Sequence, residues 1–85
     1  MALDFAWQRH GTVLFSVEHG ELEGLRPALD MFEGRTSVYL DPYGDGRLTL
    51  EHRKVLHALL PEPSALRAAL AGTLEHDDDL CWLGD

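Results

Sequence analysis

The stretch that decides the fold is "LDFAWQRHGTVLFSVE", residues 3–18. Both halves show an alternating pattern. One face of the first half would carry Leu3, Phe5 and Trp7, and one face of the second half would carry Val13, Phe15 and Val17. Such alternation is typical of half-buried strands. The two faces coincide if Trp7 lies opposite Val13, which leaves residues 9–11 as a loop with Gly11 in the left-handed conformation. The sequence therefore predicts a hairpin of strands near 3–8 and 12–18.

Helical and strand patterns follow the hairpin. Leucines at helical spacing, with a proline tolerated in the first turn, predict a helix near 25–33 that ends at Gly34. "RTSVYLD" predicts a third strand near 37–41, with Val38 and Leu40 facing inward. Thr49 and Ser64 are good N-caps. They open helices predicted near 50–60 and 64–75, and "LCWLG" predicts a last strand near 79–83. Residues 21–24 either precede the first helix or extend the strand region.

These elements mix helices and strands without strict alternation, which favours the α+β class. We expect one domain over residues 1–85, with a small, mainly antiparallel sheet and the helices on one face. At 45% hydrophobic residues the chain can bury one modest core.

Composition favours a cytoplasmic protein outside the membrane. No stretch approaches the roughly 20 apolar residues that a membrane span needs. Asp4 and the lack of a positively charged start argue against a secretion signal. Cys81 is the only cysteine, so the chain forms no internal disulfide, and its apolar surroundings predict a small buried side chain.

The net charge of −8 is unevenly distributed. Residues 1–40 carry −3, residues 41–60 are balanced, and residues 61–85 carry −5, from six acids and Arg67. An acidic chain disfavours nucleic-acid binding, which needs a basic face. A basic protein is the natural electrostatic partner, although solubility alone also explains the charge.

The stretch "DPYGDGRLTLEH", residues 41–52, has two explanations. Aligned with a calcium loop, Asp41, Asp45 and Thr49 take ligand positions, but Tyr43 and His52 stand where further oxygen ligands belong. As a turn, Pro42 and the glycines bend the backbone, the aspartates bond to nearby amides, and Thr49 starts the next helix. The turn explanation accounts for every residue, and weak calcium binding is the alternative.

"DPYGD" before a helix and "WLGD" at the end resemble a group of small uncharacterised bacterial proteins, over about residues 38–85. The resemblance implies a bacterial origin and a fold in which this turn and the terminal strand belong together. It implies no activity.

No motif for catalysis or for a cofactor is present: the five histidines are scattered, and no phosphate loop or nucleophile elbow occurs. The leading hypothesis is a non-catalytic module that binds a basic protein, for example an immunity or antitoxin-type inhibitor. Its expected steering residues are Glu75, Asp77, Asp78 and Asp79, and its expected aromatic anchors are Tyr43 or Trp82. Self-association through an edge strand is a further alternative. We expect no nucleic-acid or membrane partner.

Overall fold

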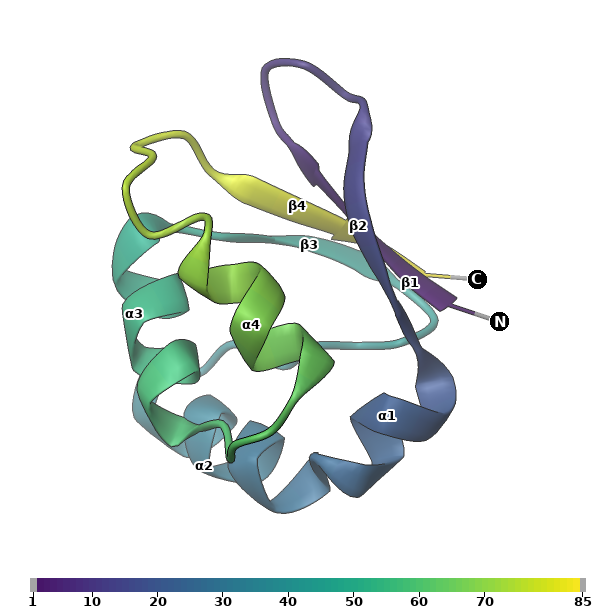
Figure 1. Ribbon diagram of the computed structural model, residues 1–85, viewed down its shortest axis with the longest axis vertical. Coiled ribbons are helices and arrows are strands. Elements are labelled where there is room, and N and C mark those ends of the chain that lie inside the picture. The colour runs from purple at the N-terminus through teal and green to yellow at the C-terminus, as the bar shows by residue number, and fades with distance from the viewer. Residues whose placement is uncertain (1, 85) are drawn as a thin grey trace.

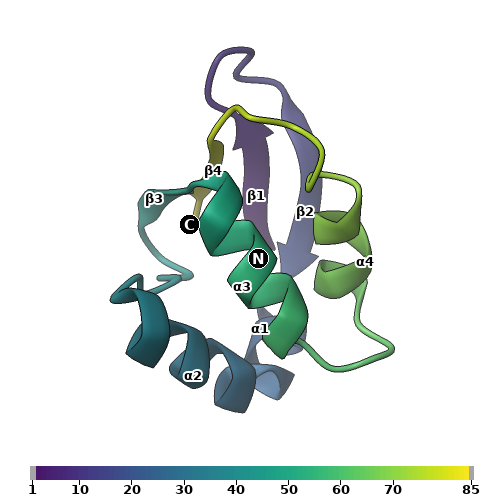
Figure 2. The same ribbon diagram turned by 90° about the vertical axis from the view of Figure 1, so that its left-hand side faces the viewer.

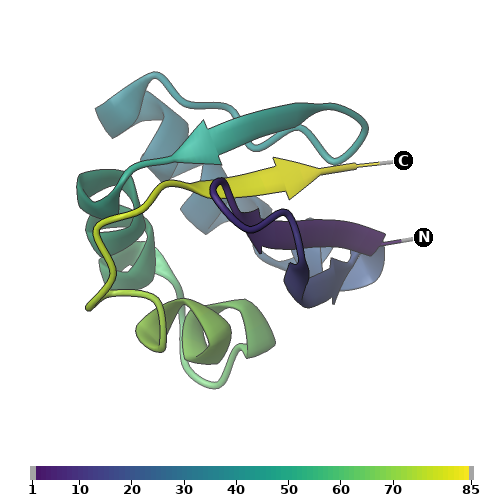
Figure 3. The same ribbon diagram turned by 90° about the horizontal axis from the view of Figure 1, so that it is seen from above.

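The computed structural model describes residues 2–84 as a four-stranded antiparallel sheet with four helices gathered on one side (Figures 1 and 3). The elements are, in chain order, β1 (Ala2–Trp7), β2 (Val13–Glu18), α1 (His19–Gly24), α2 (Arg26–Thr36), β3 (Asp45–Leu48), α3 (Leu50–Leu59), α4 (Ala65–Ala71) and β4 (Leu80–Leu83). The strand order is β2-β1-β4-β3, so β2 and β3 are the edges. The predicted α+β class is confirmed.

The hairpin of β1 and β2 forms largely in the predicted register. Phe5 lies opposite Phe15, with ring centroids 4.7 Å apart, and Gly11 has the predicted left-handed backbone, with φ 70°. The register shifts after Phe5, so Val13 lies opposite Ala6 rather than Trp7. This bulge moves the Val13 side chain from the predicted inner face to the outer face of the sheet.

Polar caps fix where two of the helices begin. The Thr49 hydroxyl accepts a hydrogen bond from the His52 amide at 3.2 Å, and the Thr49 amide donates to His52 Nδ1 at 3.3 Å, which makes a capping box at the start of α3. Ser64 caps α4 in the same way by accepting from the Arg67 amide. Both predicted caps are confirmed. From this start α3 runs between α2 and α4 and contacts both (Figure 2).

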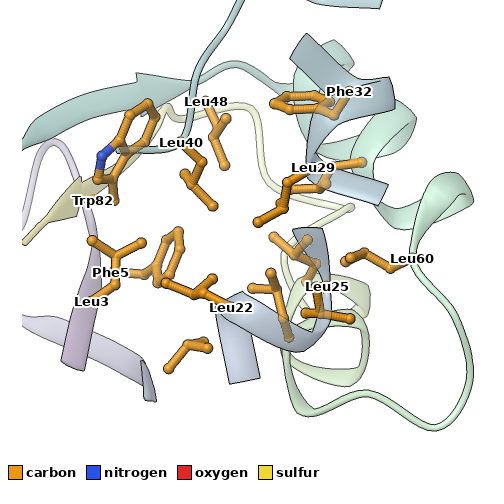
Figure 4. Close-up of a cluster of buried hydrophobic side chains, with 14 of the residues drawn as sticks. Leu3, Phe5, Leu22, Leu25, Leu29, Phe32, Leu40, Leu48, Leu60 and Trp82 are labelled. Atoms are coloured by element: carbon orange, nitrogen blue, oxygen red, sulfur yellow. The ribbon is translucent and has the colours of Figure 1, made fainter. Parts of the chain in front are cut away.

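The core lies between the helices and the inner face of the sheet. Leucines dominate it, together with Phe5, Phe32 and Trp82 (Figure 4). The Trp82 ring lies against Gly46, its cross-strand partner in β3, so closely that a Cβ at position 46 would be 2.4 Å from the ring. An aromatic ring thus covers a glycine of an edge strand and compensates for its missing side chain.

The predicted third strand is in the wrong place. Residues 37–41 form no strand, and the third strand is β3, at Asp45–Leu48. Leu40 is nevertheless buried and Val38 packs against the core, so the predicted inward positions are confirmed. The turn at Asp41 carries the chain back to pair with β4, and the fit of Gly46 under Trp82 outweighs the poor strand propensity of "DGRL".

Helix boundaries need three further corrections. Residues 19–24 form the short helix α1, which the sequence did not predict. Gly34 does not end α2, which continues to Thr36 and stops at Ser37 in the left-handed conformation. Helix α4 ends at Ala71, and Gly72 is its C-cap. The longest described helix, α2, has 11 residues, about half of what a membrane crossing needs.

Candidate functional site

The side of the sheet away from the helices is an open face. Alternation along the strands places two cross-strand rows of side chains on it. The first row is Ser16, Asp4, Leu83 and Asp45, and the second is Val13, Ala6, Cys81 and Arg47. Because β4 is apolar on both faces, it contributes Leu80 and Trp82 to the core and Cys81 and Leu83 to the open face.

The centre of the open face is apolar and shallowly hollowed. Val13 is 52% exposed and Leu83 is 61% exposed, and the half-buried Ala6 and Cys81 lie between them. Together with their charged neighbours they line a hollow of about 550 Å³. We call Val13, Ala6, Cys81 and Leu83 the apolar strip. Exposed apolar side chains that gather on one face of a small protein commonly mark a surface for another molecule.

The charges around the apolar strip differ in their pairing. The Arg47 guanidinium lies 3.8 Å from the Asp79 carboxylate and 3.4 Å from the side-chain amide oxygen of Gln8. Asp4 accepts a hydrogen bond from the Ser16 hydroxyl at 2.6 Å. Neither Asp4 nor Asp45 forms an ion pair within residues 2–84. The unpaired charge that borders the strip is therefore negative.

Cys81 lies near the middle of this face. Burial of the thiol raises its pKa above the ordinary value, and the carboxylates of Asp79, Asp78 and Asp45 act in the same direction, while Arg47 opposes them. The side chain is half-buried rather than fully buried, which corrects the prediction made from its apolar surroundings. In this state Cys81 contributes apolar surface to the face and is a weak nucleophile at neutral pH.

The acidic residues 75–79 divide into two pairs. Asp78 accepts from the Arg9 amide at 3.2 Å and lies 3.7 Å from the Arg9 side chain, and Asp79 pairs with Arg47. Glu75 and Asp77 are exposed and form no ion pair in the described part of the chain. Of the four predicted steering residues, only these two have charges that no neighbouring cation offsets.

Arg53 holds the acidic segment in place, a role that the sequence did not predict. Its side chain is fully buried and donates to the carbonyls of Thr73, His76 and Asp78 at 2.6, 3.0 and 2.7 Å. The guanidinium also lies 5.2 Å from the Trp7 ring centroid. Burial lowers the pKa of Arg53, with Asp79 and Asp78 opposing, but a guanidinium stays charged at neutral pH. The polar neighbours of Arg53 in "HRK" are typical of an exposed helix face. The only sign of burial in the sequence is that helical spacing places Arg53 on the same face as Leu56 and Leu60.

The turn at residues 41–44 forms only in part as predicted: Asp41 bonds to a nearby amide, but Asp45 accepts no such bond within residues 2–84, and neither Gly44 nor Gly46 has a positive φ. The Tyr43 amide donates to Asp41 Oδ1 at 2.9 Å, and the Gly44 amide donates to the Asp41 carbonyl at 3.3 Å. Thr49 is the N-cap of α3, so its hydroxyl is already used. Within residues 2–84 no group of three or more His, Cys, Asp or Glu side chains is arranged to hold a metal ion. The structure thus gives Asp41 and Thr49 backbone roles, and calcium binding by this loop stays a prediction.

The two predicted aromatic anchors have different surroundings. Tyr43 is 67% exposed and meets His19 edge to face at 5.3 Å. Trp82 is only 4% exposed, and its indole donates to the Asp41 carbonyl at 3.2 Å. That bond joins the 41–44 turn to the terminal strand, as does a bond from the Gly84 amide to the Gly44 carbonyl. Trp82 is therefore a core residue, and its prediction as an exposed anchor is wrong.

The chain matches no family model, no curated protein and no solved structure.

Proposed function

We propose that the protein is a non-catalytic interaction module whose open sheet face binds a basic protein partner. The observation that carries this proposal is the apolar strip, which is exposed on the one face that the helices leave uncovered and is bordered by the unpaired carboxylates of Asp4 and Asp45. Burying such a strip against a partner supplies binding free energy, and the carboxylates select for positive charge.

The net charge of −8 supports the same class of partner. Exposed acids far from the contact accelerate association with a basic protein because they act over roughly 10 Å at ordinary ionic strength. Glu75 and Asp77 serve this steering role, since Asp78 and Asp79 are partly neutralised by Arg9 and Arg47. Tyr43, which is exposed, is a candidate secondary contact. An immunity or antitoxin-type inhibitor is one concrete form, supported by small size and acidity alone.

The test is capture of partners from the source organism, followed by kinetics with the purified partner. The variant Val13→Arg/Leu83→Arg places two cations on the apolar strip. The control Met31→Arg/Ala58→Arg adds the same charge at exposed positions of the helices. We expect a basic partner whose affinity falls more than tenfold with the strip variant and less than threefold with the control. Equal effects of the two variants, or none, would refute the proposal.

Steering is tested separately from docking. The variant Glu75→Gln/Asp77→Asn removes two charges and leaves the hydrogen bond of Asp78 to the Arg9 amide and the ion pair of Asp79 with Arg47 intact. We expect a two- to fivefold slower association at low salt, with little change in the dissociation rate. An association rate that is unchanged, and equally salt-dependent, would remove Glu75 and Asp77 from the mechanism.

A further inference from the structure

The row that crosses β1, β4 and β3 has a more specific chemistry than the face as a whole. Leu83 pairs with Asp4 on one side and with Asp45 on the other. Neighbouring strands are about 4.8 Å apart, so the two carboxylates stand about 10 Å apart with an exposed leucine between them. We call Asp4, Leu83 and Asp45 the carboxylate row.

This arrangement fits the side chain of lysine or arginine. Both have a long apolar stem that packs on apolar surface while the charged end reaches outward to polar groups. Over the carboxylate row, such a stem lies on Leu83 and its cationic end reaches Asp4 or Asp45. Both acids retain acceptor capacity: within residues 2–84 the Asp45 side chain forms no hydrogen bond or ion pair, and Asp4 uses only Oδ1 toward Ser16.

The second row adds an apolar position at a fixed distance from the carboxylate row. Ala6 and Cys81 are two residues along their strands from Asp4 and Leu83, on the same face. Alternate residues of a strand are about 7 Å apart, so an apolar side chain on Ala6 and Cys81 would stand about 7 Å from a cation on the carboxylate row. An extended partner segment presents side chains at this spacing from positions i and i+2.

We propose that the open face binds an extended segment of the partner in which an apolar residue and a lysine or arginine stand two positions apart. The apolar residue lies on Ala6 and Cys81, and the cation lies over Leu83 between Asp4 and Asp45. This inference rests on the proposed function, because it names the chemistry of the segment that the face accepts. A second copy of the chain is a poorer occupant, since each copy carries −8 and the unpaired charge at the strip is negative.

The probe is the peptide acetyl-Leu-Ser-Arg-Ser-Leu-amide, titrated into isotopically labelled protein and followed by amide chemical shifts in NMR spectra. We expect shifts concentrated at residues 4–6 and 81–83 and at Asp45. The matched peptide acetyl-Leu-Ser-Glu-Ser-Leu-amide should bind at least fivefold more weakly. Equal binding of the two peptides, or shifts concentrated on the helices, would overturn the inference.

Two protein variants with the same loss of charge locate the cation. Asp4→Asn/Asp45→Asn removes the carboxylates of the row, and an asparagine at position 4 still accepts from Ser16. Glu75→Gln/Asp77→Asn removes two exposed charges elsewhere. We expect the dissociation constant of the arginine peptide to rise three- to tenfold in the first variant and less than twofold in the second. Equal effects would show that net charge alone attracts the peptide, and would refute the inference.

The outcomes separate this inference from the function on which it rests. If the partner's binding is lost in Val13→Arg/Leu83→Arg but unaffected by Asp4→Asn/Asp45→Asn, the open face is the docking surface and the proposed role of the carboxylate row is wrong. If neither variant affects the partner, both proposals fail. If the same shifts appear with rising protein concentration and no peptide, a second copy occupies the face and the basic segment does not.

Discussion

Arg53 illustrates how one buried cation can organise a segment without regular structure. Residues 72–79 contain no helix or strand, and three carbonyls of this segment point at one guanidinium. The five donors of arginine lie in a plane, so a single side chain can satisfy several acceptors at once. The position of Asp77, Asp78 and Asp79, and with it the acidic edge of the molecule, therefore depends on a residue of α3.

Replacing Arg53 with methionine tests this role. The change keeps much of the apolar stem but leaves the carbonyls of His76 and Asp78 without a donor and the Thr73 carbonyl with the His76 amide alone. Since each buried, unpaired acceptor costs about 1–3 kcal/mol, we expect the free energy of unfolding to fall by about 3 kcal/mol, measured by urea denaturation. The control Lys54→Met changes an exposed neighbour and should cost less than about 0.5 kcal/mol. Similar losses in both variants would contradict the role of Arg53.

The thiol of Cys81 gives a second prediction at the residue scale, about pH. Because burial raises the pKa of Cys81 in the folded protein, the native state keeps its proton at a pH where the unfolded chain has lost it. Its stabilising contribution is complete below the unfolded pKa, about 8.5, and is lost as pH rises through the folded value. We expect the rate of alkylation by iodoacetamide to reach half its maximum at a higher pH in native protein than in protein unfolded by urea. A native midpoint at or below the unfolded one would refute this.

At the scale of elements, the sequence predicted what local patterns control. Alternation located both strands of the hairpin, and polar caps located the starts of α3 and α4. The misplaced elements are those that tertiary contacts decide. "TSVYL" has better strand propensity than "DGRL", yet β3 forms at the second because only there does a glycine meet Trp82 across the sheet.

The sequence could predict that the sheet has an apolar outer face, but not which residues form that face. A terminal strand that is apolar on both faces, as in "LCWLG", signals an apolar outer surface. The bulge after Phe5 added Val13 to that surface, and the single-residue shift behind it has no clear signature in the sequence. Trp82 was misassigned as exposed because alternation does not say which face of a doubly apolar strand is covered.

Substitution of Gly46 with alanine tests how β3 is positioned. The added Cβ would be 2.4 Å from the Trp82 ring, and that ring is held by its bond to the Asp41 carbonyl. Overpacking of this kind costs about 1–3 kcal/mol, so we expect a destabilisation of that size in urea denaturation. In contrast, Gly34→Ala lies within α2, where a Cβ meets nothing within 4 Å, and should stabilise by about 0.5–1 kcal/mol. The decisive result is that the two substitutions change the free energy of unfolding in opposite directions. A lower stability for Gly34→Ala, or a higher stability for Gly46→Ala, would contradict the packing described here.

At the scale of the whole molecule, two features oppose each other in self-association. The open face and the edge strands β2 and β3 offer apolar surface and free backbone groups to a second copy. The net charge of −8 repels that copy, and this repulsion is strongest at low ionic strength. The basic partner proposed above would be attracted to the same surfaces, so in this proposal one charge distribution recruits the partner and opposes self-association.

This balance predicts that the purified protein is monomeric at low salt. In about 20 mM NaCl, where screening is weak, light scattering at about 100 μM protein should give the mass of one chain. Raising the salt to about 0.5 M screens the repulsion, so any dimer should appear there first and should be removed by Val13→Arg/Leu83→Arg if the open face forms it. A dimer already present at low salt, and unaffected by that variant, would show that self-association through an edge strand outweighs the charge, as the alternative hypothesis requires.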